Sequence, residues 1–276
     1  MIRIVNNIND FVKKDENIET IIQTTQETWQ KDRTEQSKKQ DTELGKLAEN
    51  IVEGYIKTNM KDITYLSYDD FRKDEFKKHA PFDGLIYNKK TTVKIQDVIN
   101  AINKEVGDNQ YGKISDSLKN KLYQNKIYIV EVKSTRVFEQ RHFVANEINL
   151  DKLLEDDFLE YPKYLRVDKF DTMNNMEAYI DFCKKYRSFK CNDNLDCLNK
   201  IKNEELSNMR HVYIRVYIDI KNSIGYIIGY ITNAEFIKNL NLKKMVQPGK
   251  SEKALYLSCS LRNASDLEEL NNIYKD

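Results

Sequence analysis

The chain has 276 residues, 45 of them Lys or Arg and 44 Asp or Glu, which gives a formal net charge of +1. This balance excludes a polycation that binds nucleic acid by bulk charge and an acidic mimic of nucleic acid. With only 8 Gly and 3 Pro, the composition also excludes collagen-like and Pro-rich linker chains. We therefore expect mostly regular structure, in a single large domain spanning 1–276.

Membrane and secreted classes are not favoured either. The longest apolar runs, such as 226–231, fall far short of the roughly 18 residues that a membrane span needs, and the N-terminus has no apolar signal region. Four cysteines are too few for a disulfide scaffold in a chain of this length. We expect a cytoplasmic protein with reduced thiols and no membrane partner.

The N-terminal third is predicted to be helical and then to enter a sheet. Residues 1–40 are interpreted as a helical arm. The next helix is predicted from apolar residues at offsets of three and four, which share one helical face. Short strands are expected at 63–66 and at 81–87, the second opening on Pro81. The apolar residues of the helix are Leu44, Leu47, Ala48, Ile51, Val52, Tyr55 and Ile56.

The rest of the chain alternates helical and extended patterns. Residues 91–124 are predicted to be a helical insertion, and the β-branched run at 127–133 a central strand buried on both faces. Residues 137–210 are interpreted as a second helical insertion and possible recognition region. In 211–276 we expect a half-buried strand at 211–220, a hairpin with 224–231, a helix from Asn233, a strand at 254–258 and a helix at 264–274. The fold class is α/β, with a mixed central sheet flanked by helices.

Two ionisable residues end the central strand. Glu131 and Lys133 are two positions apart, so their side chains share one face of the strand. Asp83 lies in the strand that opens on Pro81. If these strands are neighbours, two carboxylates converge beside an ammonium group, and such hard oxygen ligands suit Mg²⁺. A lysine there could orient the attacking water or offset charge that develops on phosphorus.

The order Pro81-x-Asp83 followed by Glu131-x-Lys133 resembles the signature of the PD-(D/E)xK nuclease superfamily, to which most type II restriction endonucleases belong. Glu49 on the preceding helix resembles the acid that many members carry there, and Ser134-Thr135 after the lysine is also common. The resemblance covers 43–136 and makes 41–136 the expected catalytic core. It implies that Asp83, Glu131 and the carbonyl of Val132 hold Mg²⁺, with Glu49 supporting a second metal and Lys133 handling the water.

The resemblance implies a Mg²⁺-dependent endonuclease acting on double-stranded DNA, most simply a dimeric type II restriction enzyme. A defence or repair nuclease with looser specificity is the first alternative, and a non-catalytic DNA-binding module with the same fold is the second. The separation from Asp83 to Glu131, 131 − 83 = 48 positions, is longer than is common in the family. The purely structural alternative makes Asp83 a loop residue and pairs Glu131 with Lys133.

Weaker signals concern phosphate and zinc binding. Arg136 and Arg141 follow the central strand and are candidates for contacts to the DNA backbone. Residues 210–250 hold seven Lys or Arg against two Asp or Glu, a local excess that could line a DNA cleft or form a solvated face. A zinc site is disfavoured, because Cys183, Cys191 and Cys197 lack the closely spaced pairs of structural zinc sites.

Overall fold

The computed structural model describes residues 2–12, 19–20, 34–109, 112–160, 206, 209–246 and 253–275. The chain divides into two compact units. The first comprises Met1–Phe158, Arg210–Thr232 and Ser260–Asp276, and the second Leu159–Met209 and Asn233–Cys259. Every site considered below lies in the first unit.

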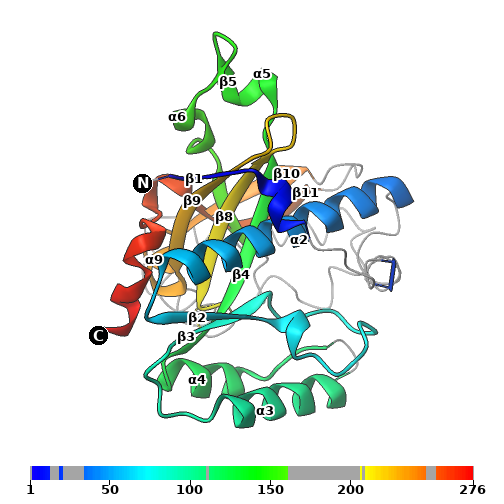
Figure 1. Cartoon of the computed structure of the whole chain (residues 1–276), viewed down its shortest axis with the longest axis vertical. Coiled ribbons are helices and arrows are strands. Elements are labelled where there is room, and N and C mark those ends of the chain that lie inside the picture. The colour runs from blue at the N-terminus through cyan, green and yellow to red at the C-terminus, as the bar shows by residue number, and fades with distance from the viewer. Residues whose placement is uncertain are drawn as a thin grey trace, which may run out of the picture. The chain divides into compact units, whose positions relative to one another are not determined.

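A mixed six-stranded sheet is the centre of the first unit (Figure 1). Its order is β1-β9-β8-β4-β3-β2, and β4 and β8 are parallel while the other neighbours are antiparallel. The predicted α/β class with a mixed sheet is confirmed at this level. The strands are β1 (Arg3–Asn6), β2 (Ile63–Ser67), β3 (Gly84–Asn88), β4 (Ile127–Arg136), β8 (Val212–Asp219) and β9 (Ile224–Thr232).

The N-terminus corrects one prediction. Residues Arg3–Asn6 form the edge strand β1, which pairs antiparallel with β9 from Arg3↔Ile227 onward, so a helical arm is wrong for these residues. A 3₁₀ helix, η1 (Ile8–Phe11), follows. A strand of four residues has too short a pattern to be seen in sequence, because its partner lies more than 200 positions away. Residues 13–18 and 21–33 of the predicted arm lie outside the described residues.

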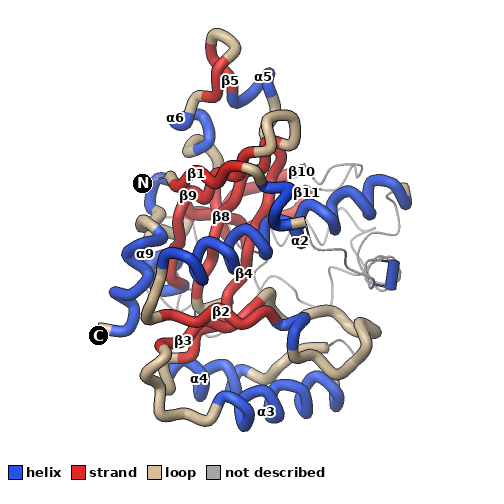
Figure 2. Tube along the Cα trace, viewed as in Figure 1, coloured by secondary structure: helices blue, strands red, loops and turns tan. Residues whose placement is uncertain are grey.

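Helix α2 (Glu35–Asn59) covers one face of the sheet, and Figure 2 shows it running across the strands. The Thr34 hydroxyl caps it by accepting from the Ser37 amide. The predicted apolar face is confirmed, since its residues share one core with residues of β4 and β8. The buried members of that face are Leu44, Ala48, Ile51, Val52 and Ile56, and the strand residues facing them are Val130, Val132, Val212, Ile214, Val216 and Ile218.

Two further helices fill the predicted insertion at 91–124. They are α3 (Ile95–Asp108) and α4 (Asp116–Gln124), and they pack on a second core with Leu85 of β3 and Ile127 and Ile129 of β4. Strand β4 therefore carries apolar residues into two cores, one on each face. This accounts for its unbroken β-branched run and confirms the prediction of a strand buried on both faces over its first half.

Two other expectations need correction. Strand β8 was predicted to be half-buried, but seven of its eight residues are buried and only Arg215 is intermediate. The alternation of apolar and polar residues predicted one exposed face, but the amphipathic side chains of Tyr213 and Tyr217 on that face pack as core residues. Of the segment 137–210, predicted to be helical, residues 161–205 lie outside the described residues. Residues 137–160 lack an apolar stripe long enough for a helix of several turns and hold only short elements. These are α5 (Glu139–His142), β5 (Phe143–Val144), β6 (Glu147–Ile148), α6 (Leu150–Leu153) and β7 (Asp157–Glu160).

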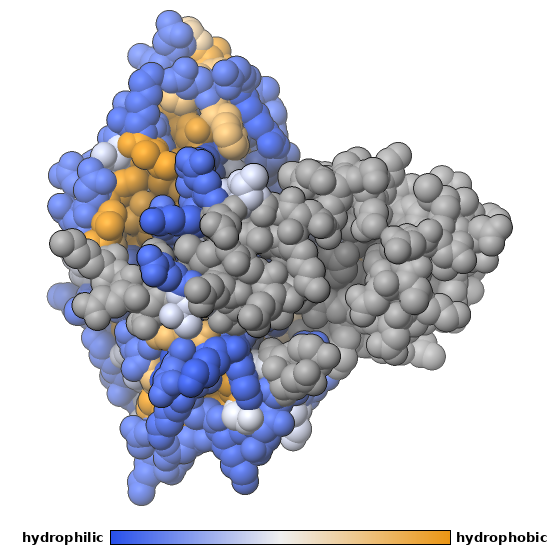
Figure 3. Space-filling view, turned by 90° about the vertical axis from the view of Figure 1, so that its right-hand side faces the viewer, coloured by the Kyte–Doolittle hydropathy of each residue, from blue (hydrophilic) through white to orange (hydrophobic). Residues whose placement is uncertain are grey.

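The C-terminal predictions hold in outline. Strands β8 and β9 form the expected hairpin, α9 (Asn233–Lys238) begins at Asn233, and β10 (Asn241–Val246) pairs with β11 (Lys253–Ser260). After η3 (Leu261–Asn263), the final helix is the 3₁₀ helix η4 (Leu267–Tyr274), shorter than predicted. Figure 3 shows hydrophilic residues over most of the described surface on the face it draws. Among the described residues no helix is long and apolar enough to cross a membrane.

Candidate active site

The candidate site lies where the β3–β4 ladder ends. Strand β3 pairs with β4 only as far as Gly84↔Val130, whereas β8 pairs with β4 from Val130 to Arg136. Beyond Val130, therefore, β4 keeps one neighbouring strand and loses the other. Glu131 and Lys133 project from this half-open part of the strand, on the face opposite to Val130 and Val132.

Asp83 occupies the position that β3 leaves open. The strand predicted from Pro81 begins three residues later, at Gly84, so Asp83 precedes the strand. Its amide donates to the carbonyl of Val130 at 3.0 Å, and its Oδ2 accepts from the Val132 amide at 2.6 Å. These two bonds fix the Asp83 carboxylate beside Glu131, so the two predicted strands are neighbours and their acids do converge.

Glu131 is held between two cations. Lys133 Nζ lies 2.6 Å from Oε1 and Arg210 Nε lies 3.1 Å from Oε2. Burial favours the neutral carboxyl, but Lys133 and Arg210 outweigh it and lower the pKa of Glu131. Glu131 is therefore an anion at neutral pH, with both oxygens engaged.

Glu49 approaches the same place from α2. Lys46, one turn earlier, contacts Glu49 Oε2 at 2.8 Å and Asp69 Oδ2 at 2.6 Å. Burial and the nearby Asp83 carboxylate nevertheless raise the pKa of Glu49 to about 8, because Lys46 offsets them only in part. Burial alone would lower the pKa of Lys46, but the carboxylates of Glu49 and Asp69 outweigh burial and raise this pKa.

Asp83 is the least compensated of the three acids. Burial and the Glu131 carboxylate raise the pKa of Asp83 to about 7, against the opposing effects of Lys46, the Val132 amide and Lys133. In the described part of the chain, no Lys or Arg nitrogen lies within ion-pair distance of its carboxylate. Burial and the neighbouring acids therefore keep Glu49 and Asp83 from both being fully ionised near neutral pH.

A tyrosine closes the site on the side of β2. A Cβ on Gly84 would lie 2.6 Å from the Tyr65 hydroxyl, so only glycine lets this ring pass beside Asp83. Tyr65 is 8% exposed, and its hydroxyl has no hydrogen-bond partner among the residues that the structure describes. Burial, followed by Glu49 and Asp83, raises the pKa of Tyr65 well above its usual range. The phenol is thus a neutral group next to the carboxylates.

Sequence reasoning missed three residues of this site: Lys46, Arg210 and Tyr65. The i, i+3 spacing of Lys46 and Glu49 was a readable signal, because residues three apart are neighbours on a helix. Arg210 had no such signal, since it reaches Glu131 only because β8 pairs with β4. Val132 is in the site through its amide, which binds Asp83.

A divalent cation is compatible with the donors present. No group of three His, Cys, Asp or Glu side chains in the described ranges is arranged to hold a metal ion on its own. Mg²⁺ does not require such a cage, since it commonly takes one or two carboxylates, several waters and a substrate phosphate. Asp83 and Glu131 supply two hard oxygen donors, and the raised pKa of Asp83 marks a carboxylate that a cation would stabilise.

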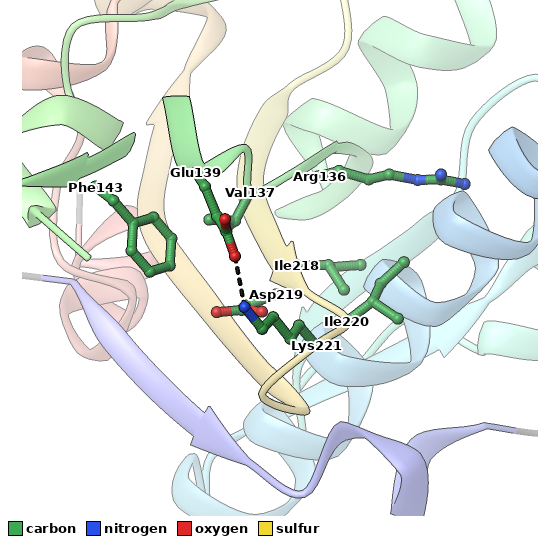
Figure 4. Close-up of a pocket in the computed structure, with 8 residues that line it drawn as sticks. All are labelled: Arg136, Val137, Glu139, Phe143, Ile218, Asp219, Ile220 and Lys221. Atoms are coloured by element: carbon green, nitrogen blue, oxygen red, sulfur yellow. Dashed lines mark hydrogen bonds and ion pairs between the residues drawn. The ribbon is translucent and has the colours of Figure 1, made fainter. Parts of the chain in front are cut away.

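The arginines proposed for DNA contact lie at the far end of β4. Arg141 is exposed and ion-paired with Asp156. Arg136 lines a pocket that also contains Glu139 and Lys221 (Figure 4), and these two face each other in an ion pair of 2.6 Å. This pocket lacks the carboxylates of the candidate site, so we consider the two places separately.

His211, which directly precedes β8, is a core residue. Nδ1 of His211 accepts from the Ile129 amide at 3.0 Å, and its ring packs edge-on against Tyr123 and Tyr128. Burial, together with Lys119 and Arg210, lowers the pKa of His211 to about 3. Cys259 is a free buried thiol. The cysteines of the zinc hypothesis, Cys183, Cys191 and Cys197, lie outside the described residues.

Comparisons of the chain with protein-family models, with curated proteins and with solved structures found no match in any of the three.

Proposed function

We propose that the protein is a Mg²⁺-dependent endonuclease that hydrolyses phosphodiester bonds in double-stranded DNA. The observation that carries the proposal is the meeting of Asp83, Glu131 and Lys133 where the β3–β4 ladder ends, with Glu49 nearby. These are the residues for which the sequence resembles the PD-(D/E)xK nucleases. Their joint placement supports a common site, which four unrelated structural roles would not require.

In this proposal the acids hold the metal and the lysine acts on the substrate. Asp83, Glu131 and the carbonyl of Val132 would hold Mg²⁺, with Glu49 supporting a second ion. Bound Mg²⁺ supplies Lewis-acid stabilisation of charge on the phosphoryl oxygens. The ammonium group of Lys133 orients the attacking water or offsets charge on the phosphorus. Arg210 positions Glu131 through its 3.1 Å contact.

The resemblance implies a type II restriction enzyme, acting as a homodimer and leaving 5′-phosphate ends. A defence or repair nuclease with looser specificity would use the same residues. The product pattern separates the two, because a sequence-specific enzyme gives discrete bands and a loosely specific one gives a smear.

The test is incubation of purified protein with plasmid DNA, with and without Mg²⁺. We expect Mg²⁺-dependent cleavage that falls by about 10²- to 10³-fold in Asp83→Asn and Lys133→Ala, the usual loss when one electrostatic group at the reacting centre is removed. Glu49→Gln should reduce it less, because a second-metal role is auxiliary.

Matched controls come from the same elements. Asp62→Asn and Glu43→Gln change exposed acids, the first ahead of β2 and the second on α2, and should leave cleavage unchanged. If wild type cuts no nucleic acid with any divalent metal, or if Asp83→Asn cuts as fast as Asp62→Asn, the proposal is wrong.

A non-catalytic DNA-binding module is the second candidate, and one observation favours it. Both oxygens of Glu131 and both oxygens of Glu49 already contact cations of the chain. Carboxylates engaged in this way can be purely structural. Under this alternative the wild type would bind DNA with equal affinity with and without Mg²⁺, and would not cleave it.

A further inference from the structure

The face of β4 that carries Lys133 continues across the parallel ladder onto β8, where Arg215 lies between the buried Tyr213 and Tyr217. The parallel register sets Lys133 beside Arg215 and Thr135 beside Tyr217. Neighbouring residues in paired strands project to the same face, and the strands lie about 4.8 Å apart. Arg215 therefore stands next to the lysine of the candidate site, although the two are 82 positions apart in sequence.

Among the residues that the structure describes, no Asp or Glu is a partner of Arg215. Its Nη2 donates to the Thr135 hydroxyl at 2.5 Å, and its guanidinium carbon lies 5.2 Å from the centre of the Tyr217 ring. Its Nε is buried, and none of the described residues accepts a hydrogen bond from it. No Asp or Glu of the described residues lies within ion-pair distance of Arg215, in contrast to five arginines of the same unit that do have such a contact. Those are Arg3, Arg72, Arg141, Arg210 and Arg262.

The contacts of Arg215 orient the guanidinium without neutralising it. Thr135 supplies a hydroxyl oxygen, and Tyr217 is itself held by the carboxylate of Asp156, to which its hydroxyl donates. A half-buried arginine normally has a carboxylate partner, because removing its charge from water is costly. A guanidinium that is held in place but has no carboxylate partner is suited to binding an oxyanion such as phosphate.

We propose that Arg215 binds a backbone phosphate of the nucleic acid, adjacent to the phosphate that Asp83, Glu131 and Lys133 would act on. This inference rests on the proposed function for the identity of the anion. Thr135 and Tyr217 are positioning residues for the guanidinium. Arg215 is a stronger candidate for this contact than Arg141, whose charge is offset by Asp156.

The test measures binding without cleavage. Asp83→Asn serves as the background, in EDTA, and the affinity for a fluorescein-labelled DNA duplex is measured by anisotropy over a series of salt concentrations. Adding Arg215→Gln should weaken binding about tenfold and reduce the slope of log K against log salt by about 0.9, the value for one lost phosphate contact. Adding Arg215→Lys should keep the slope and lose less affinity, because the charge remains.

Two comparisons make the test specific. Arg262→Gln, at an exposed arginine 3.8 Å from Asp151, removes one charge elsewhere and should change the affinity less than twofold. Both substitutions of Arg215 remove the planar guanidinium that contacts Thr135 and Tyr217, so a merely structural role predicts equal losses for Lys and Gln. Equal losses, or an Arg215→Gln variant with the affinity and slope of the background, would overturn the inference.

The result is separable from the nuclease assay. Binding through Arg215 by a wild type that never cleaves would contradict the proposed nuclease and leave the phosphate contact standing. If the wild type cleaves DNA with Mg²⁺ but Arg215→Gln leaves the DNA affinity unchanged, only the phosphate contact is contradicted.

Discussion

Two buried aspartates near the start of the sheet differ in how the chain compensates their charge. Asp74 receives two bonds from the Arg72 guanidinium, at 2.8 and 2.9 Å, and one from the Lys78 amide at 3.0 Å. Burial alone would raise the pKa of Asp74, but the interaction with Arg72 outweighs burial and lowers this pKa. Asp83 receives one amide bond, and burial with Glu131 raises its pKa to about 7.

The difference separates a structural acid from a candidate functional one. The Arg72–Asp74 pair is complete within the protein and has nothing further to bind. Asp83 is left with charge that an external cation could compensate, and perturbed acids of this kind are concentrated at functional sites. Asp69 links the two regions, since it contacts both Arg72 and Lys46.

The largest stability effect is expected at Asp74. Asp74→Asn leaves the buried Arg72 guanidinium with Asp69 as its remaining acid, at 3.1 Å, and should lower the free energy of unfolding by roughly 3 kcal/mol at pH 7. Because the folded-state pKa of Asp74 is lowered, its stabilisation is lost as pH falls through that pKa, and the difference should narrow at pH 3. Urea denaturation of wild type and variant at both pH values measures this. If Asp74→Asn were as stable as wild type at pH 7, Asp74 would not be the structural acid that the comparison with Asp83 requires.

Asp83→Asn is expected to act in the opposite direction. The pKa of Asp83 rises from 3.8 to about 7 on folding, so between those values the folded state binds a proton that the unfolded chain has released, and stability falls as pH rises. Asparagine keeps an acceptor for the Val132 amide and cannot ionise. The variant should therefore be more stable than wild type by at least about 1 kcal/mol at pH 8, and show no gain at pH 4.

Thermal or urea denaturation at pH 4 and pH 8 measures the stability change expected for Asp83→Asn at each pH, with Asp62→Asn as the control at an exposed acid. An Asp83→Asn variant that loses stability at pH 8, as Asp74→Asn does at pH 7, would mean that Asp83 is an ordinary structural acid.

Tyr65→Phe tests the same contrast on a smaller scale. The Tyr65 hydroxyl is buried beside the carboxylates with no partner, so its removal should be neutral or stabilise the fold by up to about 1 kcal/mol. Tyr68→Phe is the matched control, since the Tyr68 hydroxyl is likewise buried with no partner among the described residues, while its ring centre lies 5.0 Å from the Arg72 guanidinium carbon. A clear loss in Tyr65→Phe alone would show that its hydroxyl has a partner in solution.

Much of the fold was predictable because the patterns are local. The β-branched run of β4, the β8–β9 hairpin and the helices α3 and α4 follow from apolar periods and turn residues. Strand β1 and the short elements between 139 and 160 were missed, because elements of two to four residues carry no usable period and depend on tertiary pairing.

The candidate site likewise has residues that the sequence predicted and residues that it did not. The convergence of Asp83 and Glu131 followed from two strands expected to be neighbours, and the shared face of Glu131 and Lys133 from their spacing. The partners Arg210 and Arg215 did not follow, because both reach the site only through the parallel pairing of β8 with β4. The roles of these residues in catalysis stay predictions.

The most direct test of the account is calorimetric titration of Mg²⁺ into wild type and Asp83→Asn at pH 6.5, each in two buffers with different ionisation enthalpies. We expect the wild type to bind Mg²⁺ with a heat that depends on the buffer, because metal binding displaces protons from carboxyl groups whose pKa is raised, and we expect Asp83→Asn to bind far more weakly. Absence of Mg²⁺ binding by the wild type, or binding that Asp83→Asn leaves unchanged, would contradict a metal-dependent site at Asp83.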